Sequence, residues 1–128
     1  MSANHAPALR AMALEVAMTL ARYERHVRRL AGTWLDMELY RTVSQEIDEV
    51  RLSCAAIPEL TAPWTALLVS HADLVYALWY CGNGKQGPAW DAVEHRLEEH
   101  LERVDTLARR CVALAPQSCV ARQCKIAD

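Results

Sequence analysis

The chain has 128 residues, of which 52% are hydrophobic and 23% are charged, and its formal net charge at pH 7 is −2. This length suffices for one domain with a substantial core, and the composition is typical neither of a disordered segment nor of a membrane protein. The slight acidic balance provides no global field that would attract nucleic acid or an anionic membrane surface, so neither is expected as a partner. We therefore expect one soluble domain, residues 1–128.

The cysteines and the N-terminal residues indicate a compartment. Residues 1–20 do not have the pattern of a secretory signal peptide, and the number of cysteines, five, is odd. Such cysteines are interpreted as reduced and mostly buried thiols, with packing of the tail or a disulfide between Cys119 and Cys124 as alternatives. We expect a cytoplasmic protein, and a composition rich in Arg and Ala but lacking Phe suggests a bacterial origin.

Hydrophobic periodicity predicts two helices in the first half of the chain. Apolar residues recur every three or four positions from Leu9 to Leu30, which predicts a helix over residues 8–31 that ends before Gly32. A second apolar stripe, with Thr33 as the expected N-cap, predicts a helix over residues 34–57. The short connection between them predicts an antiparallel hairpin.

Two further helices are predicted in the second half. Pro58 and Pro63 interrupt the pattern, and Thr61 is the expected N-cap of a helix over residues 62–81. A glycine-rich loop then precedes Pro88, which suits the first position of a helix over residues 88–115. The predicted fold is an all-α, antiparallel up-and-down four-helix bundle with a short C-terminal tail.

His71 is the first candidate for a functional residue, because helical spacing places it in the apolar stripe of the third predicted helix. A core histidine satisfied by a hydrogen bond from another helix is one interpretation, and a ligand-binding, metal-binding or pH-sensing role is the other. His100 flanks the core stripe of the fourth helix and is expected to approach His71, with Glu46 or Glu49 as possible companions. These two histidines are the predicted ligand-binding residues.

The motifs of common catalytic and metal-binding bundles are missing. Di-iron bundles need Glu-x-x-His on two helices, and this spacing does not occur. Two histidines without a third ligand make a weak metal site, and His71 is not followed by the lysine and small residues of a histidine phosphotransfer module. The loop Gly82-Asn83-Gly84-Lys85 is not a phosphate-binding Walker loop. We therefore predict no catalytic residue, no metal ligand and no cofactor.

The third predicted helix carries more apolar side chains than one core face requires. Val69, Tyr76 and Tyr80 lie away from its main stripe, which indicates deeper burial, a covering tail or a partner. We predict that these residues form an interface and that the chain is a homodimer. The expected function is a small interaction or regulatory module that binds an as yet unknown protein; the alternative is a bundle that binds a small ligand or a metal near His71.

Overall fold

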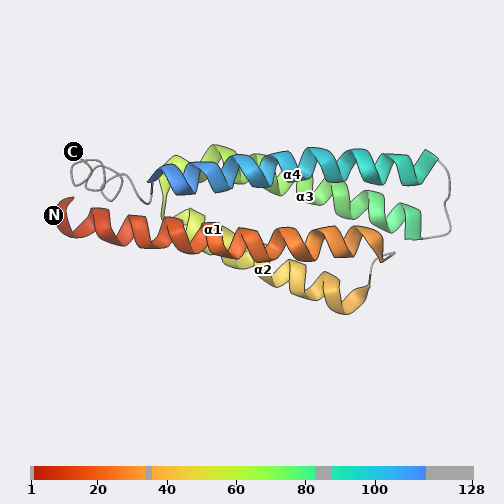
Figure 1. The fold of residues 1–128 in the computed structure, drawn as a ribbon, viewed down its shortest axis with the longest axis horizontal. Helices are drawn as coiled ribbons and strands as arrows, with labels where there is room; N and C mark the ends of the chain where they lie inside the picture. Colours follow the sequence, from red (N-terminus) through yellow and green to blue (C-terminus); the bar gives the residue numbers. More distant parts are fainter. Residues whose placement is uncertain (1, 34–35, 83–87, 115–128) are drawn as a thin grey trace, which may run out of the picture.

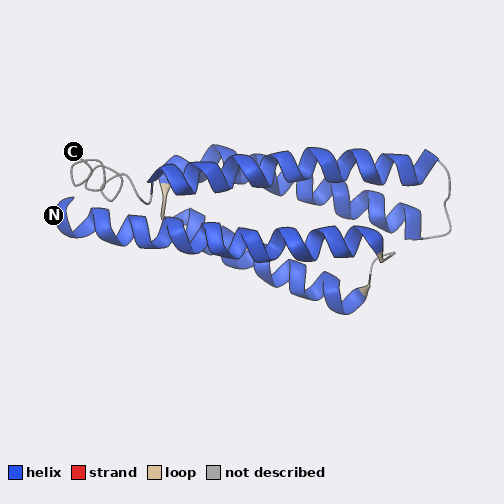
Figure 2. Ribbon diagram, viewed as in Figure 1, coloured by secondary structure: helices blue, strands red, loops and turns tan. Residues whose placement is uncertain are grey.

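The computed structural model describes residues 2–33, 36–82 and 88–114. These residues form the helices α1 (Ser2–Gly32), α2 (Met37–Ala55), α3 (Thr61–Gly82) and α4 (Pro88–Leu114), with a short 3₁₀ helix, η1 (Pro58–Leu60), before α3. Consecutive long helices run in opposite directions along one axis, and the described ranges contain no strand (Figures 1 and 2). The predicted all-α up-and-down bundle is confirmed. The predicted tail, with Cys119 and Cys124, and the glycine loop at residues 83–87 lie outside the described residues.

The core is built from one apolar stripe on each long helix. Side chains three and four residues apart on a helix lie on the same face, so each stripe can be buried against the others. Burial of one such aliphatic side chain stabilises the fold by about 1.5–3 kcal/mol. The buried apolar residues include Val16, Leu20, Val27, Leu30, Val43, Ile47, Val50, Ile57, Leu60, Leu67, Leu74, Leu78, Val93, Val104 and Leu107.

The four long helices of the described chain do not contact one another equally. α3 packs mainly on α4, and α1 packs on both α2 and α4, whereas α2 and α3 contact each other little (Figure 1). One side of α3 is therefore covered by α4, and a wide part of its surface has no neighbouring helix in the described chain.

The start of α2 differs from the prediction. Thr33 does not cap this helix; its hydroxyl donates to the Leu30 carbonyl, 3.1 Å away. Asp36 is the N-cap, because its Oδ1 accepts hydrogen bonds from the backbone N–H groups of Glu38 and Leu39, at 3.0 and 3.1 Å. One carboxylate thus satisfies two N–H groups that have no partner within the helix, and α2 begins at Met37 rather than at residue 34.

The connection between α2 and α3 also differs from the prediction. Ile57 has an extended backbone, as expected before a proline, and Pro58 begins η1. Thr61 was predicted to be the N-cap of α3 but is the first residue of that helix. Its backbone N–H donates to the Pro58 carbonyl. Leu60 is buried and fixes this connection to the core.

α3 has apolar side chains both on its core face and on its exposed side, but no helix of the described chain is long and apolar enough to span a membrane.

Candidate functional site

Four polar side chains meet in the core and form what we call the polar layer: Tyr23 of α1, Ser70 and His71 of α3, and His100 of α4. Helical periodicity turns each of them inward, because apolar core residues lie about one turn before and after each position. Tyr23 and His100 are fully buried, Ser70 is nearly so, and His71 is partly exposed. The layer therefore replaces hydrophobic packing with hydrogen bonds at one level of the bundle.

Tyr23 is the centre of the polar layer. Its hydroxyl oxygen lies 2.6 Å from Nδ1 of His71 and 2.5 Å from Nε2 of His100. The three rings surround this oxygen, with their centroids 5.6 to 5.8 Å apart in each pair. The other nitrogen of His100, Nδ1, is 2.6 Å from the hydroxyl of Ser70. One phenol oxygen thus joins α1, α3 and α4.

The hydrogens of this layer can be assigned by counting donors. The Ser70 hydroxyl donates its single proton to the Leu67 carbonyl, 2.9 Å away, so it must accept from Nδ1–H of His100. Nε2 of a neutral His100 then has a lone pair and accepts from the Tyr23 hydroxyl, which in turn accepts from Nδ1–H of His71. All bonds therefore run in one direction, from His71 to the Leu67 carbonyl.

Burial keeps both imidazoles neutral. Desolvation lowers the pKa of His71 to about 4. It lowers the pKa of His100 to about 3, with a smaller contribution from the neighbouring His71. The pKa of Tyr23 is raised well above its usual value, mainly by burial and secondarily by the charge of Glu46. Near pH 7 the layer therefore consists of two neutral imidazoles and a neutral phenol.

The pair formed by Ser70 and His100 is poorly suited to nucleophilic catalysis. An activated serine needs a base whose pKa lies near the working pH. It also needs a third group that orients this base and stabilises its protonated form. The pKa of His100, about 3, is far lower, and its third group is the phenol of Tyr23 rather than a carboxylate. His100 is therefore a neutral imidazole held by hydrogen bonds rather than a general base.

A second polar pair connects α1 with α2. Nδ1 of His26 lies 2.9 Å from both carboxylate oxygens of Glu46, which is buried. Glu46 is close enough to Tyr23 for its charge to affect the phenol. With this pair, buried polar contacts involve all four long helices of the described chain.

The structure brings together some of the predicted site residues. His71 and His100 do approach each other, but each bonds the Tyr23 hydroxyl, which lies between them. Glu46 is buried beside this layer and bonds His26. Glu49 is not part of the site, since it is exposed and lies 3.7 Å from Arg22.

Tyr23 and Ser70 were not predicted. Tyr23 belongs to the apolar stripe of α1, where its ring was read only as a hydrophobic group. Its hydroxyl was the signal that could have identified it, because a buried tyrosine hydroxyl needs a hydrogen-bond partner. Ser70 bonds His100 of α4, and the available signal was a small polar residue about one helical turn from the core residues Leu67 and Leu74. Which polar groups meet depends on how three separate helices are aligned.

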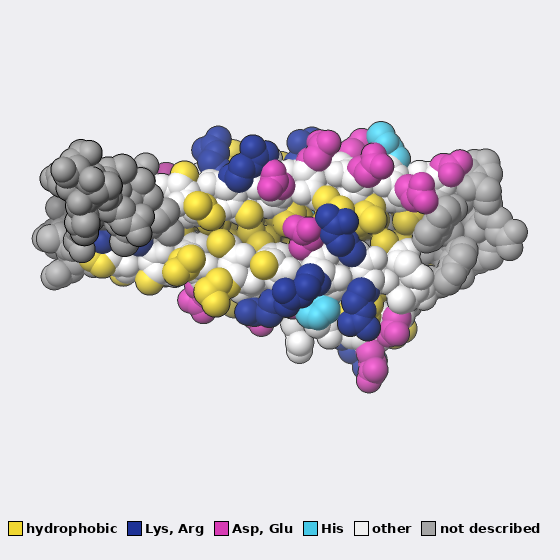
Figure 3. Space-filling view, viewed as in Figure 1, with side chains coloured by type: hydrophobic (Ala, Val, Ile, Leu, Met, Phe, Trp, Pro, Cys, Tyr) yellow, Lys and Arg dark blue, Asp and Glu magenta, His cyan; other side chains and the backbone are white. Residues whose placement is uncertain are grey.

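The predicted interface residues are exposed on α3. We call the outer face of α3 the surface formed by Leu68, Val69, Ala72, Tyr76, Trp79 and Tyr80; its large side chains are 40%, 58%, 73%, 51% and 52% exposed, in chain order. Leu68 and Ala72 were not predicted to belong to it. Figure 3 shows the view onto α1 and α4, where hydrophobic side chains run along the middle of the surface and charged side chains gather along its edges and over one half.

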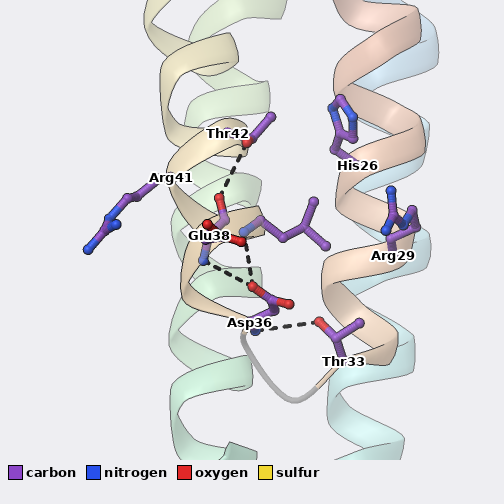
Figure 4. Close-up of a pocket in the computed structure, with 8 residues that line it drawn as sticks. His26, Arg29, Thr33, Asp36, Glu38, Arg41 and Thr42 are labelled. Atoms are coloured by element: carbon purple, nitrogen blue, oxygen red, sulfur yellow. Dashed lines mark hydrogen bonds between the residues drawn. The ribbon is translucent and has the colours of Figure 1, made fainter.

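A groove of about 560 Å³ separates the end of α1 from the beginning of α2. His26 and Arg29 line it from α1, and the N-cap residue Asp36 and Glu38 of α2 line it from the other side, whereas the side chain of Arg41 points away (Figure 4). Asp36 is occupied as the N-cap of α2, so the groove does not present it as a free ligand.

Clusters of metal-binding side chains and cysteine thiols are further places where chemistry could occur. No group of three or more His, Cys, Asp or Glu side chains in these ranges is placed to hold a metal ion. Cys54 and Cys111 are buried free thiols, and burial raises their pKa values to about 12 and about 11. Both cysteines are therefore protonated and unreactive near pH 7.

Comparisons with protein-family models, with curated proteins and with solved structures found no match for this chain.

Proposed function

We propose that the protein is a small interaction module that assembles as a homodimer through the outer face of α3. The observation that supports this proposal is the exposure of large apolar side chains on that face, with Tyr76 73% and Val69 58% exposed. Contiguous apolar surface of this kind on a small domain is typical of a protein–protein interface. The side of α3 away from α4 has little contact with α2, so it is open to a partner.

A second copy of the chain fits this face because the order of its side chains is self-complementary. If a two-fold axis passes at Ala72, two α3 helices run antiparallel, and residues equally far before and after Ala72 lie opposite each other. Leu68 of one copy then faces Tyr76 of the other, and Thr65 faces Trp79. The small side chain of Ala72 allows the two helices to approach closely at the axis.

The charges beside the outer face are mixed, which is compatible with an interface between identical copies. Asp73 lies at its edge, and Arg96, Glu99 and Arg103 of α4 line the adjoining shallow pockets. A two-fold axis can bring an acidic group of one copy towards a basic group of the other without repulsion between like charges. Buried thiols in a reduced state suit the cytoplasmic, bacterial setting that we propose for this module.

The decisive substitution is Ala72→Arg. It places a charge at the proposed axis while keeping a good helix former at an exposed position, so the isolated fold should be unaffected. We expect the wild-type protein to sediment as a dimer, with twice the chain mass of 14.4 kDa. The substitution should raise the dissociation constant of the dimer at least about ten-fold. Analytical ultracentrifugation across a concentration series measures both.

The matched control is Ala11→Arg, at an exposed position on α1. It adds the same charge away from α3 and should leave the dimer intact. A wild-type chain that stays monomeric at all concentrations, or a dimer that both variants preserve equally, contradicts the proposed interface.

The second candidate function is the binding of a small ligand or a metal ion near His71. The observation that favours it is the convergence of His71 and His100 on one oxygen atom, that of Tyr23.

A further inference from the structure

We propose that a pocket between α3 and α4 is the binding site for Tyr76 of a second copy of the chain, so that two tyrosines anchor the dimer reciprocally. This inference rests on the proposed function, the dimer through the outer face of α3, and it adds α4 to the interface. We call the site the Arg103 pocket; its volume is about 280 Å³, and it adjoins the outer face. Its lining residues are Ala66, Val69, Ser70 and Asp73 of α3 and Glu99 and Arg103 of α4.

The two-fold axis at Ala72 sets the level along α3 at which Tyr76 of the second copy lies. Tyr76 follows Ala72 by four residues, so it lies about 6 Å from the axis along the helix, at the level of Leu68 in the other copy. The residues of α3 that line the Arg103 pocket lie between positions 66 and 73, a range that includes this level. The tyrosine therefore meets the other copy at the height of the pocket.

The same symmetry sets the side of α3 from which the tyrosine approaches. A two-fold axis that is perpendicular to both helices and to the line joining them relates each side of α3 to the same side in the other copy, so the two sides that border α4 meet. Tyr76 is on this side, because it lines a second, smaller pocket together with Ala92 and Arg96 of α4. Tyr76 of the second copy therefore faces the border between α3 and α4, where the Arg103 pocket opens.

Tyr76 has the exposure and the chemistry of an anchor residue. It is 73% exposed, more than any other large hydrophobic side chain of the described residues. Binding in a pocket would remove its ring from water, while its hydroxyl needs a hydrogen-bond partner there. Tyrosine and arginine are among the residues that contribute most to the affinity of protein interfaces.

The Arg103 pocket offers a partner to each part of the tyrosine. The Asp73 carboxylate and the Arg103 guanidinium have no hydrogen-bond or ion-pair partner among the described residues, so both are available. Glu99, by contrast, is already paired with His95 at 2.9 Å. In the dimer the phenol hydroxyl donates to Asp73, and the ring lies beside Arg103, because a guanidinium is attracted to an aromatic face.

The test is the dissociation constant of the dimer, measured by analytical ultracentrifugation for variants on both sides of the contact. Tyr76→Ala should raise it at least about 30-fold, as expected for an anchor residue. Tyr76→Phe and Asp73→Ala each remove one partner of the same hydrogen bond and should each raise it about ten-fold. Because both act on one bond, the double variant should raise it little further than either substitution alone.

The matched control is Leu52→Ala, which removes a 65% exposed apolar side chain from α2 and should leave the dissociation constant unchanged. Circular dichroism verifies that each variant is folded. A dimer that Ala72→Arg dissociates, but whose dissociation constant Tyr76→Ala changes by less than about two-fold, overturns the pocket contact and leaves the dimer through α3 standing. Effects of Tyr76→Phe and Asp73→Ala that multiply in the double variant overturn it as well, because the two side chains then do not touch. A wild-type chain that stays monomeric overturns both proposals.

Discussion

Tyr23 determines the energetics of the polar layer, because its single hydroxyl serves two buried imidazoles. A buried polar group without a partner costs far more than a satisfied one contributes, so such a network depends on each of its members. Among the described residues, every buried side-chain nitrogen or oxygen has a hydrogen-bond partner. Loss of the hydroxyl would leave one nitrogen of His71 and one of His100 unpaired.

Tyr23→Phe tests this dependence. The substitution keeps the buried ring and removes only the oxygen, so we expect the free energy of unfolding to fall by about 1–3 kcal/mol. Urea denaturation followed by circular dichroism measures the change. Thr106→Val, which removes the hydroxyl of an exposed threonine of α4, is the control and should change stability by less than about 0.5 kcal/mol. Equal stability of the wild type and Tyr23→Phe would mean that the layer makes no net contribution.

At the scale of single helices, periodicity was a reliable guide to the body of each element and a poor one to its ends. The stripe from Leu9 to Leu30 predicted α1, because a buried helical face must repeat every three or four residues. The start of α2 was predicted wrongly, since both Thr33 and Asp36 can accept from a helix N-terminus and the chain path decides which one does. The course of the connection between α1 and α2 cannot be predicted from the neighbouring residues alone.

The candidate site, too, could be predicted from the sequence only in part. The inward positions of His71 and His100 follow from each helix alone, so their approach could be predicted. That Tyr23 lies between them could not, because it depends on the relative alignment of α1, α3 and α4 along the bundle. That Val69 and Tyr76 lie outside the core stripe of α3 was inferred from an excess of apolar residues on one helix, a property that the sequence does contain, and the structure shows both side chains exposed.

The cap of α2 provides a prediction at this scale. Asp36→Ala removes the acceptor of two backbone N–H groups, so we expect a loss of about 1 kcal/mol in the free energy of unfolding. Asp36→Asn retains an acceptor and should recover most of it. Asp48→Ala, at an exposed position within α2, is the control for removal of a carboxylate. A cost for Asp48→Ala as large as that for Asp36→Ala would show that charge, rather than capping, is responsible.

At the scale of the whole molecule, the buried polar contacts join helices that pack unequally. Tyr23, Ser70, His71 and His100 connect α1, α3 and α4, and the His26–Glu46 pair attaches α2 to α1. α2 and α3 have little direct contact, so the polar layer and the His26–Glu46 pair add specific contacts to a bundle whose helices pack unequally. The same level makes the fold sensitive to acid.

The sign of that sensitivity follows from the lowered pKa values of His71 and His100, about 4 and about 3. Above the pKa of the unfolded chain, about 6.5, both states are neutral and the stability is fully present. Below it, the unfolded chain binds two protons that the folded chain excludes, so stability is lost as the pH falls.

We expect the free energy of unfolding to decrease by about 3–4 kcal/mol between about pH 7 and about pH 5, because each of the two histidines contributes close to 1.4 kcal/mol per pH unit once the unfolded form is protonated. Urea denaturation at a series of pH values measures the slope. His100→Gln removes one titrating group and should halve this slope. A stability that is the same at both pH values would mean that the imidazoles are protonated within the fold, and that the one-way chain of hydrogen bonds through Tyr23 is wrong.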